Sequence, residues 1–132
     1  MALLSLDVSN FDTSNVRYMD DIFYYPKLKS LDVSNFNALN IISMMSVFSG
    51  CLSLTSLYVS NFDTSKVTIM AAMFADCSSL ISLALSNFDT SNVMVISNML
   101  QNCMSLTSID ISSFNTGKLK GISSLFKSCT KL

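Results

Sequence analysis

The stretch LTSLYVSNFDTSKVTIMAAMFADC, residues 54–77, is one copy of a pattern that recurs along the whole chain. Its Ser-Asn-Phe triplet, or a Ser-Ser-Phe variant, returns every 25 or 26 residues, ending at Phe11, Phe36, Phe62, Phe88 and Phe114. Seven further positions also hold apolar residues in nearly every unit, at constant distances from this phenylalanine. In this copy and the residues that follow it, they are Val67, Met70, Phe74, Cys77, Leu80, Leu83 and Leu85. Such columns indicate a repeat array, in which each unit is stabilised by its neighbours.

The two halves of each unit differ in hydrophobic period. Residues 54–60, LTSLYVS, alternate apolar and polar side chains towards their end, which predicts a short strand. Residues 67–74 place apolar side chains at positions i, i+3, i+6 and i+7, which predicts two turns of helix. The short oxygen side chains of Asp63, Thr64 and Ser65 come just before that segment and would cap the helix.

The column spacing resembles the BspA-like leucine-rich repeats of bacterial surface proteins, in the 26-residue variant of Listeria and Mycoplasma surface lipoproteins. The most specific part of the likeness is the Phe-x-x-Cys-x-x-Leu junction, as in Phe48, Cys51 and Leu54. The resemblance implies an α/β fold: a leucine-rich-repeat-like, right-handed solenoid of five repeats of about 26 residues, each a short strand plus a short helix. It also implies a cell-surface or extracellular location, and binding or adhesion in place of catalysis.

The repeats fill residues 1–132, so we expect a single repeat domain. The first unit lacks one residue near Pro26, and the fifth contains Gly117 and Gly121. Neither unit is a clear polar cap, and we therefore expect the domain to be a fragment of a longer surface protein.

Composition excludes several functions. The chain has no His and no Glu, so it lacks a Ser-His or Cys-His couple and a His-ligated metal site. A net charge of −1 argues against bulk nucleic-acid binding. Half of the residues are hydrophobic, yet the longest uncharged stretch, residues 33–62, is interrupted by Ser and Asn and does not predict a membrane span. We expect no enzyme activity, no cofactor and no metal.

The four cysteines occupy one column, 26 residues apart: Cys51, Cys77, Cys103 and Cys129. Free cysteine is among the most buried residue types, which favours core thiols. One disulfide between neighbouring units stays possible. A metal site is disfavoured because its ligands must converge on a point, and these would lie along a line.

The outward strand column varies between units, with Asp7, Asp32 and Asp110 replaced by Tyr58 and Ala84 in the third and fourth. The resemblance implies that this strand face is concave and binds ligands, and tyrosine is a favoured interface anchor. The predicted ligand-binding residues are Asp7, Lys29, Asp32, Thr55, Tyr58, Ile81, Thr107 and Asp110. A uniform column on the same face is interpreted as structural: Ser5, Ser30, Ser56, Ser82 and Ser108.

A second candidate surface lies on the outer face of the predicted helices. A helical wheel places apolar side chains there in the middle units, as a possible convex interface: Ile42, Met45, Ile69, Met94 and Val95. The alternative is that the helix phase is wrong, or that the segment is not a regular helix.

The two ends of the chain differ in charge. Residues 1–25 contain four Asp and one Arg, for a net charge of −3, and residues 107–132 contain four Lys and one Asp, for +3. These charges could keep the exposed edges hydrated, or they could let molecules stack head to tail.

The sequence thus predicts a non-enzymatic protein- or ligand-binding module of a bacterial surface or adhesion protein. Its expected partner is a protein or glycan ligand, with a host as one source of it. The alternative is a structural protein that self-assembles end to end or through the apolar convex face, and a homo-oligomer would form through the repeat ends.

Overall fold

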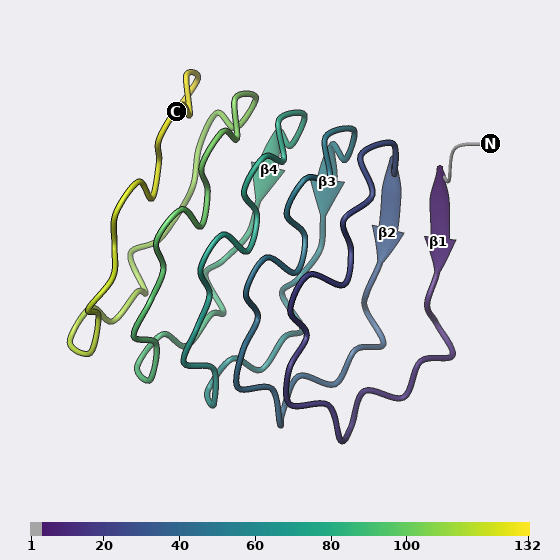
Figure 1. The fold of residues 1–132 in the computed structure, drawn as a ribbon, viewed down its shortest axis with the longest axis horizontal. Helices are drawn as coiled ribbons and strands as arrows, with labels where there is room; N and C mark the ends of the chain where they lie inside the picture. Colours follow the sequence, from purple (N-terminus) through teal and green to yellow (C-terminus); the bar gives the residue numbers. More distant parts are fainter. Residues whose placement is uncertain (1–3) are drawn as a thin grey trace.

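The structure is a computed structural model that describes residues 4–132, and it shows the repeat units as successive coils stacked in chain order (Figure 1). The first four coils each contain one short strand: β1 (Ser5–Asp7), β2 (Ser30–Asp32), β3 (Ser56–Leu57) and β4 (Ser82–Leu83). All four lie on one wall of the stack. The period-two segments of the first four units therefore form strands of two or three residues, whereas the corresponding residues 106–111 of the fifth unit form none.

Pairing between strands is parallel and follows the repeat. Leu6 of β1 lies opposite Leu31 of β2, and Leu57 of β3 lies opposite Leu83 of β4. These pairs form two separate two-stranded sheets. The leucines point inward and the flanking serines outward, as the alternation of a strand requires.

The predicted α/β, leucine-rich-repeat-like solenoid with a helix in every unit is wrong, because residues 4–132 contain no helix. The segments expected to be helical contain residues in the left-handed region. In the third coil, Ala72 has a φ of 54° and Asp76 has a φ of 61°. The pair recurs in the next coil at Asn98 and Asn102. A right-handed helix cannot pass through such residues, so each coil turns there. Equally, no helix in this part of the chain could cross a membrane.

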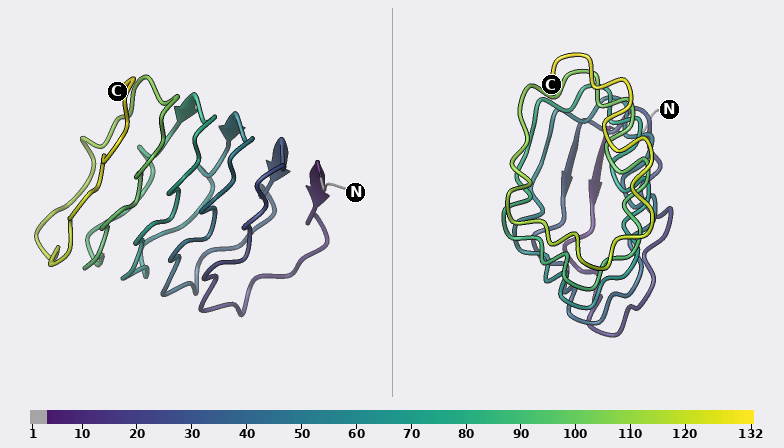
Figure 2. Two further views of the ribbon diagram at one scale, coloured as in Figure 1. Left: turned by 45° about the horizontal axis from the view of Figure 1, so that its top comes forward. Right: turned by 90° about the vertical axis from the view of Figure 1, so that its left-hand side faces the viewer.

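The corresponding segments of successive coils lie side by side (Figure 2). Their N–H groups bond to the next coil and also close local turns, as where Met73 and Ala75 donate to the carbonyls of Met70 and Ala72. The N–H groups of Met70, Ala72 and Phe74 donate to carbonyls of the fourth coil, each over 2.9 Å. Single-residue parallel bridges join these segments from coil to coil, and we call this side of the stack the bridged wall. The bridged residues are, in order, Tyr18, Ser43, Ile69, Val95 and Gly121. Stacking therefore satisfies the polar groups that a helix would have satisfied locally.

The expected helix caps are turns of another kind. The Asp63 carboxylate accepts a hydrogen bond of 2.9 Å from the N–H of Ser65, two residues later. Asp12 and Asp89 make the same contact with Ser14 and Ser91. No helix follows these residues, so the motif closes an Asx turn at a corner of the coil.

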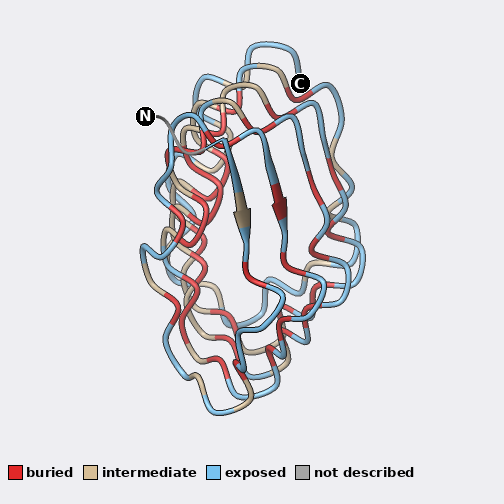
Figure 3. Ribbon diagram, turned by 90° about the vertical axis from the view of Figure 1, so that its right-hand side faces the viewer, coloured by how far each residue is buried: buried red, intermediate tan, exposed pale blue. Residues whose placement is uncertain are grey.

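The core lies inside the coils and consists of columns that run along the stack (Figure 3). Phe23, Phe48 and Phe74 form one column, in which successive ring centroids are 5.6 Å apart and nearly parallel. Phe36 and Phe62 contact this column at an angle. Each coil thus covers the apolar side chains of its neighbour, which no coil could bury alone.

The cysteine column is a ladder of hydrogen-bonded thiols, and all four are free. The Sγ atoms of Cys51, Cys77 and Cys103 donate to carbonyls of the preceding coil, at 2.9, 3.2 and 3.2 Å. Burial raises the pKa of Cys103 to about 12 and holds that of Cys77 well above its usual range. The predicted core thiols are confirmed for these three, while Cys129 in the last coil is only half-buried.

Asparagine side chains form two more ladders at the coil corners. In one, the amides of Asn35, Asn61 and Asn87 donate to carbonyls one coil before them, at 3.1, 2.6 and 3.1 Å. In the other, Asn40 and Asn92 donate in the same direction at 2.8 Å. These bonds fix each coil in register with its predecessor.

A threonine column forms a third ladder of side-chain hydrogen bonds, which runs to the following coil and not to the preceding one. The buried hydroxyls of Thr13, Thr64 and Thr90 donate to carbonyls of the following coil, at 3.2, 3.0 and 3.2 Å. Every buried side-chain nitrogen or oxygen in residues 4–132 has a hydrogen-bond partner. The stack is therefore held by matched polar ladders around an apolar interior.

Candidate functional site

The strand face carries an outward column whose side chains differ between coils. Asp7 and Asp32 lie opposite each other at the ends of β1 and β2. Tyr58 comes directly after β3 and is 79% exposed, the largest exposed fraction among the exposed large hydrophobic side chains of residues 4–132. Ala84 and Asp110 occupy the equivalent places in the next two coils. A large aromatic side chain therefore stands beside the smallest member of its column.

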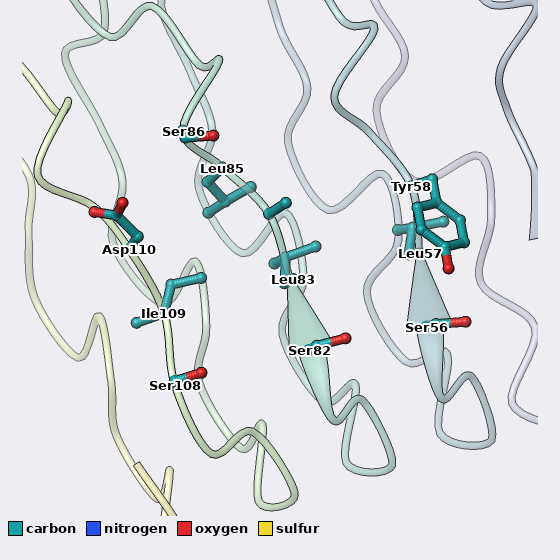
Figure 4. Close-up of a pocket in the computed structure, with 11 residues that line it drawn as sticks. Ser56, Leu57, Tyr58, Ser82, Leu83, Leu85, Ser86, Ser108, Ile109 and Asp110 are labelled. Atoms are coloured by element: carbon teal, nitrogen blue, oxygen red, sulfur yellow. The ribbon is translucent and has the colours of Figure 1, made fainter.

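Two shallow hollows flank Tyr58. The first, of about 430 Å³, lies between Tyr58 and Asp110, where Ala84 leaves space (Figure 4). The second, of about 670 Å³, lies between Tyr58 and the paired Asp7 and Asp32. The Tyr58 ring lies along β3 with its hydroxyl directed towards Ser56. The ring thus forms a wall that both hollows share.

Serines line both hollows beside apolar side chains such as Leu57 and Leu31. The first is lined by Ser56, Ser82 and Ser108, and the second by Ser5, Ser30 and Ser56. The sequence interpretation treats this column as structural and omits it from the site. Side chains two residues apart on a strand lie on the same face. The spacing of Ser56 and Tyr58 could therefore have placed the serine column in the site.

The aspartate carboxylates of the strand face also accept hydrogen bonds from the backbone. Asp7, Asp32 and Asp110 each accept a hydrogen bond of 2.9 Å from the N–H of the serine two residues later. Hydrogen bonds from the Ser34 hydroxyl and N–H lower the pKa of Asp32, although the nearby charge of Asp7 opposes the shift. Only one oxygen of each carboxylate is used by its turn, so the other can contact a ligand.

The turn carboxylates predict how stability depends on pH. Hydrogen bonds from serines two residues later lower the pKa of six aspartates: Asp7, Asp12, Asp32, Asp63, Asp89 and Asp110. A lowered folded-state pKa stabilises the fold above the unfolded value of about 3.9, and this stabilisation is lost as the pH falls through the folded-state pKa. With no His or Glu, we expect a constant melting temperature from about pH 8 to 5 and a fall below about pH 4. Circular-dichroism melting across this range is the measurement, and a loss that begins above about pH 6 would contradict the assignment.

The other four predicted ligand residues are exposed but lie outside the hollows. Lys29, Thr55, Ile81 and Thr107 form the column at the beginning of the strands. Their backbones pair between coils: Ile81 donates to Thr55, and Thr107 donates to Ile81. The structure therefore gathers Asp7, Asp32, Tyr58 and Asp110 around the hollows and leaves this second column at their border.

The predicted convex residues lie on the bridged wall and not on a helix. Ile69 and Val95 are bridge partners, and Met94 precedes Val95. Ile42 is separated from Met94 by Thr68 in the hydrogen-bonded ladder. Four of the five are half-buried, and Met45 is 39% exposed.

Within residues 4–132, no three His, Cys, Asp or Glu side chains converge as metal ligands.

Comparison with known families decides the relationship of the chain. The family model described as "Mycoplasma protein of unknown function, DUF285" matches residues 2–83 and residues 43–132. The chain belongs to DUF285. The two matches overlap and together reach almost every residue, so the DUF285 pattern includes the strand face, the cysteine ladder and both end coils. No curated protein and no solved structure matches the chain. DUF285 is thus a repeat family whose function must be argued from the site.

Proposed function

We propose that this chain is a non-enzymatic binding module of a bacterial surface protein, and that it holds its ligand on the strand face. The observation that carries the proposal is Tyr58, an exposed aromatic side chain between two hollows that serines and apolar side chains line together. The interior of this repeat is uniform, whereas this column differs from coil to coil. Variation on a constant frame is what a specific contact surface requires.

The chemistry of the face suits a partner that is a protein or a glycan. Tyr58 offers an aromatic surface, the serines offer donors and acceptors, and Asp7, Asp32 and Asp110 offer negative charge. Tyrosine contributes disproportionately to binding because it buries a large area at little entropic cost. The carboxylates favour a partner with cationic groups, and its association should weaken at high salt.

The surface location rests on the resemblance to BspA-like surface repeats and on membership of a Mycoplasma repeat family. Adhesion to host-derived proteins or glycans is the role that this resemblance favours. The absence of histidine and glutamate supports binding in place of catalysis, because few groups remain that could act as a general base near neutral pH.

The test is a binding screen of the chain against purified matrix proteins and a glycan array, followed by variants against each positive probe. Tyr58→Ala removes the anchor and leaves the core untouched. Asp32→Asn and Asp110→Asn remove charge but keep an oxygen that can accept the turn hydrogen bond. We expect Tyr58→Ala to weaken binding at least about thirtyfold, as for an interface anchor.

Tyr18→Ala is the matched control, because Tyr18 is 65% exposed and belongs to the bridged wall. It should bind like the unaltered chain. Binding to no probe, or binding that survives Tyr58→Ala and both asparagine variants, would refute the proposal for the strand face. Tyr58→Ala and Tyr18→Ala should melt at the temperature of the unaltered chain, which separates lost contacts from lost folding. Asp32→Asn and Asp110→Asn should melt slightly lower, because the turn hydrogen bond then lacks the carboxylate charge.

A further inference from the structure

The bridged wall carries no charged side chain in its three middle coils. The segments that form the wall there are residues 41–50, 67–75 and 93–103, and they include no Asp, Glu, Lys or Arg. All charged residues of the chain lie elsewhere, although such residues make up about a quarter of an average soluble domain. Depletion of charge, with methionine and tyrosine enriched, is the composition of the core of a protein interface. The middle of this wall therefore suits a protein partner better than it suits solvent.

Apolar side chains remain accessible along this stretch. Met45 is 39% exposed, and Ile69 and Val95, at the middle of the wall, are half-buried. The coil-to-coil ladder already uses the N–H groups of Thr68 and Ala72. A partner therefore contacts this wall through side chains and does not add a strand to it.

Opposite charges border the uncharged coils. The first coil adds Arg17, Asp20 and Asp21 to the wall, and the fifth coil adds Lys120 and Lys127. The first border is thus net negative and the fifth is net positive. Two copies that meet wall to wall attract each other when the order of their coils is reversed, because each acidic border then faces a basic one. The same order in both copies would place like charges together.

Side-chain sizes are also complementary under this reversal. Tyr18, which is 65% exposed, is the first bridged residue, and Gly121 is the last. Tyr24, which is 64% exposed, has the same place in the first coil as Lys127 in the fifth. A two-fold axis across the middle coil brings Tyr18 of one copy onto Gly121 of the other. It also brings Tyr24 beside Lys127, where an aromatic ring attracts a cation, and Ile69 onto itself.

A hollow of about 350 Å³ lies beside Met94 and Lys120. Ile42 belongs to the same hydrogen-bonded column as Met94, so the reversal brings Ile42 of the second copy onto Met94 at this hollow. The column begins at Arg17 and continues to Lys120. These two cations would also meet, and this one pair opposes the contact.

We propose that two copies of this chain pack bridged wall against bridged wall about a two-fold axis, with the order of their coils reversed. The interface is isologous, because both copies use the same surface, so association stops at the dimer. Five coils about 4.8 Å apart span roughly 20 Å. A wall of that height buries on the order of 1,000 Å² between two copies, which is near the lower limit for a specific interface. We therefore expect a dimer that dissociates on dilution and leaves Tyr58 on the strand face free.

Sedimentation equilibrium of the chain tests the proposal. The mean mass should rise from the 14.5 kDa of one chain towards twice that value as the concentration increases, and it should level off there. Ile69→Lys places two cations against each other at the axis and should weaken association at least about tenfold. Ile81→Lys is the matched control, because Ile81 is 53% exposed beside β4 and not on the bridged wall, and it should associate like the unaltered chain.

Chemical cross-linking tests the order of the coils. Ile42→Cys and Met94→Cys place a thiol in the same column, in the second and the fourth coil. A short bismaleimide should join the two variants when they are mixed, but it should not join either variant to itself. The unaltered chain gives the background from its own thiols, of which only Cys129 is not buried. Variants that each cross-link to themselves as readily as to each other would overturn the reversed order.

A variant that strengthens association guards against loss of folding as the explanation. Arg17→Glu turns the repulsion with Lys120 into an attraction and should tighten association several-fold. Lys29→Glu changes the total charge equally but lies at the beginning of β2, outside the bridged wall, and it should have little effect. The proposal fails if the unaltered chain and Arg17→Glu are both monomeric up to about 100 μM, if growth continues beyond the dimer, or if Lys29→Glu tightens association as much as Arg17→Glu does.

Discussion

Replacement of Phe74 by Ala should lower the free energy of unfolding by about 3–5 kcal/mol, the range for an aromatic side chain deleted from a sealed core. Phe74 is fully buried in the middle coil, and its ring lies 5.6 Å from that of Phe48. Its loss would leave a cavity between the second and fourth coils, where stacked neighbours hold both walls in place. The surrounding backbone cannot collapse into this cavity without breaking the coil-to-coil ladder.

Urea unfolding followed by circular dichroism measures this effect, with Phe11→Ala as the matched control. Phe11 is 59% exposed in the first coil, so its truncation should cost less than about 1 kcal/mol. Equal losses for the two variants would mean that the columns are not sealed from within. Because repeat arrays can lose cooperativity, the m-value should be compared between variants before free energies are extracted.

Ala72→Pro should destabilise the fold by about 3 kcal/mol or more. Ala72 has a φ of 54°, which proline cannot adopt, and its N–H donates to the Ser97 carbonyl over 2.9 Å. The substitution therefore breaks both the turn and one rung of the ladder. Ala72→Gly at the same position should stabilise by up to about 1 kcal/mol, because glycine adopts positive φ without the steric cost that alanine bears.

The glycine variant also discriminates between the coil and the helix. In a helix interior, Ala→Gly costs about 1 kcal/mol, so the two structures predict opposite signs. Chemical denaturation of both variants beside the unaltered chain gives the answer. Glycine that destabilises as proline does would contradict the left-handed turn at residue 72.

The strands of the first four coils could be predicted from the sequence, but the conformation of the segments expected to be helical could not. Alternation around Leu57 and Leu83 depends only on which side chains face the core, and it correctly gave strands. The spacing of Val67, Met70 and Phe74 also reports which side chains face the core, but a helix and a folded coil both satisfy it. What decides between them is pairing with the next coil, and this partner lies about 26 residues away.

Local signals at the turns were weak. Gly50 is the only glycine with positive φ in residues 4–132, while the equivalent places hold Asp76, Asn102 and Ser128. Asparagine and aspartate tolerate this conformation, but they also suit helix caps and Asx turns. Ala72 gives no signal at all. Its conformation is imposed by the ladder and not by its own preference.

The sequence predicts which residues face outward at the candidate site but not the hollows between them. The outward column of Asp32, Tyr58 and Asp110 follows from the repeat alignment alone. The two hollows depend on the size difference between Tyr58 and Ala84 and on serines behind them, which matter only once the strands lie side by side. The sequence favours a structural interpretation of the uniform serine column, although a column can be constant and still be accessible to a ligand.

The hydrogen bonds that join coils have a consequence for the length of the array. Each side-chain bond of the asparagine and threonine ladders closes a loop of 24 to 28 residues, wherever along the stack it lies. The entropic cost of closing such a loop varies only with the logarithm of its length, so every added coil faces nearly the same cost and gains nearly the same contacts. A chain built in this way can therefore gain or lose a whole coil without needing a new kind of contact, and its length is set by repeat number and not by a closed core.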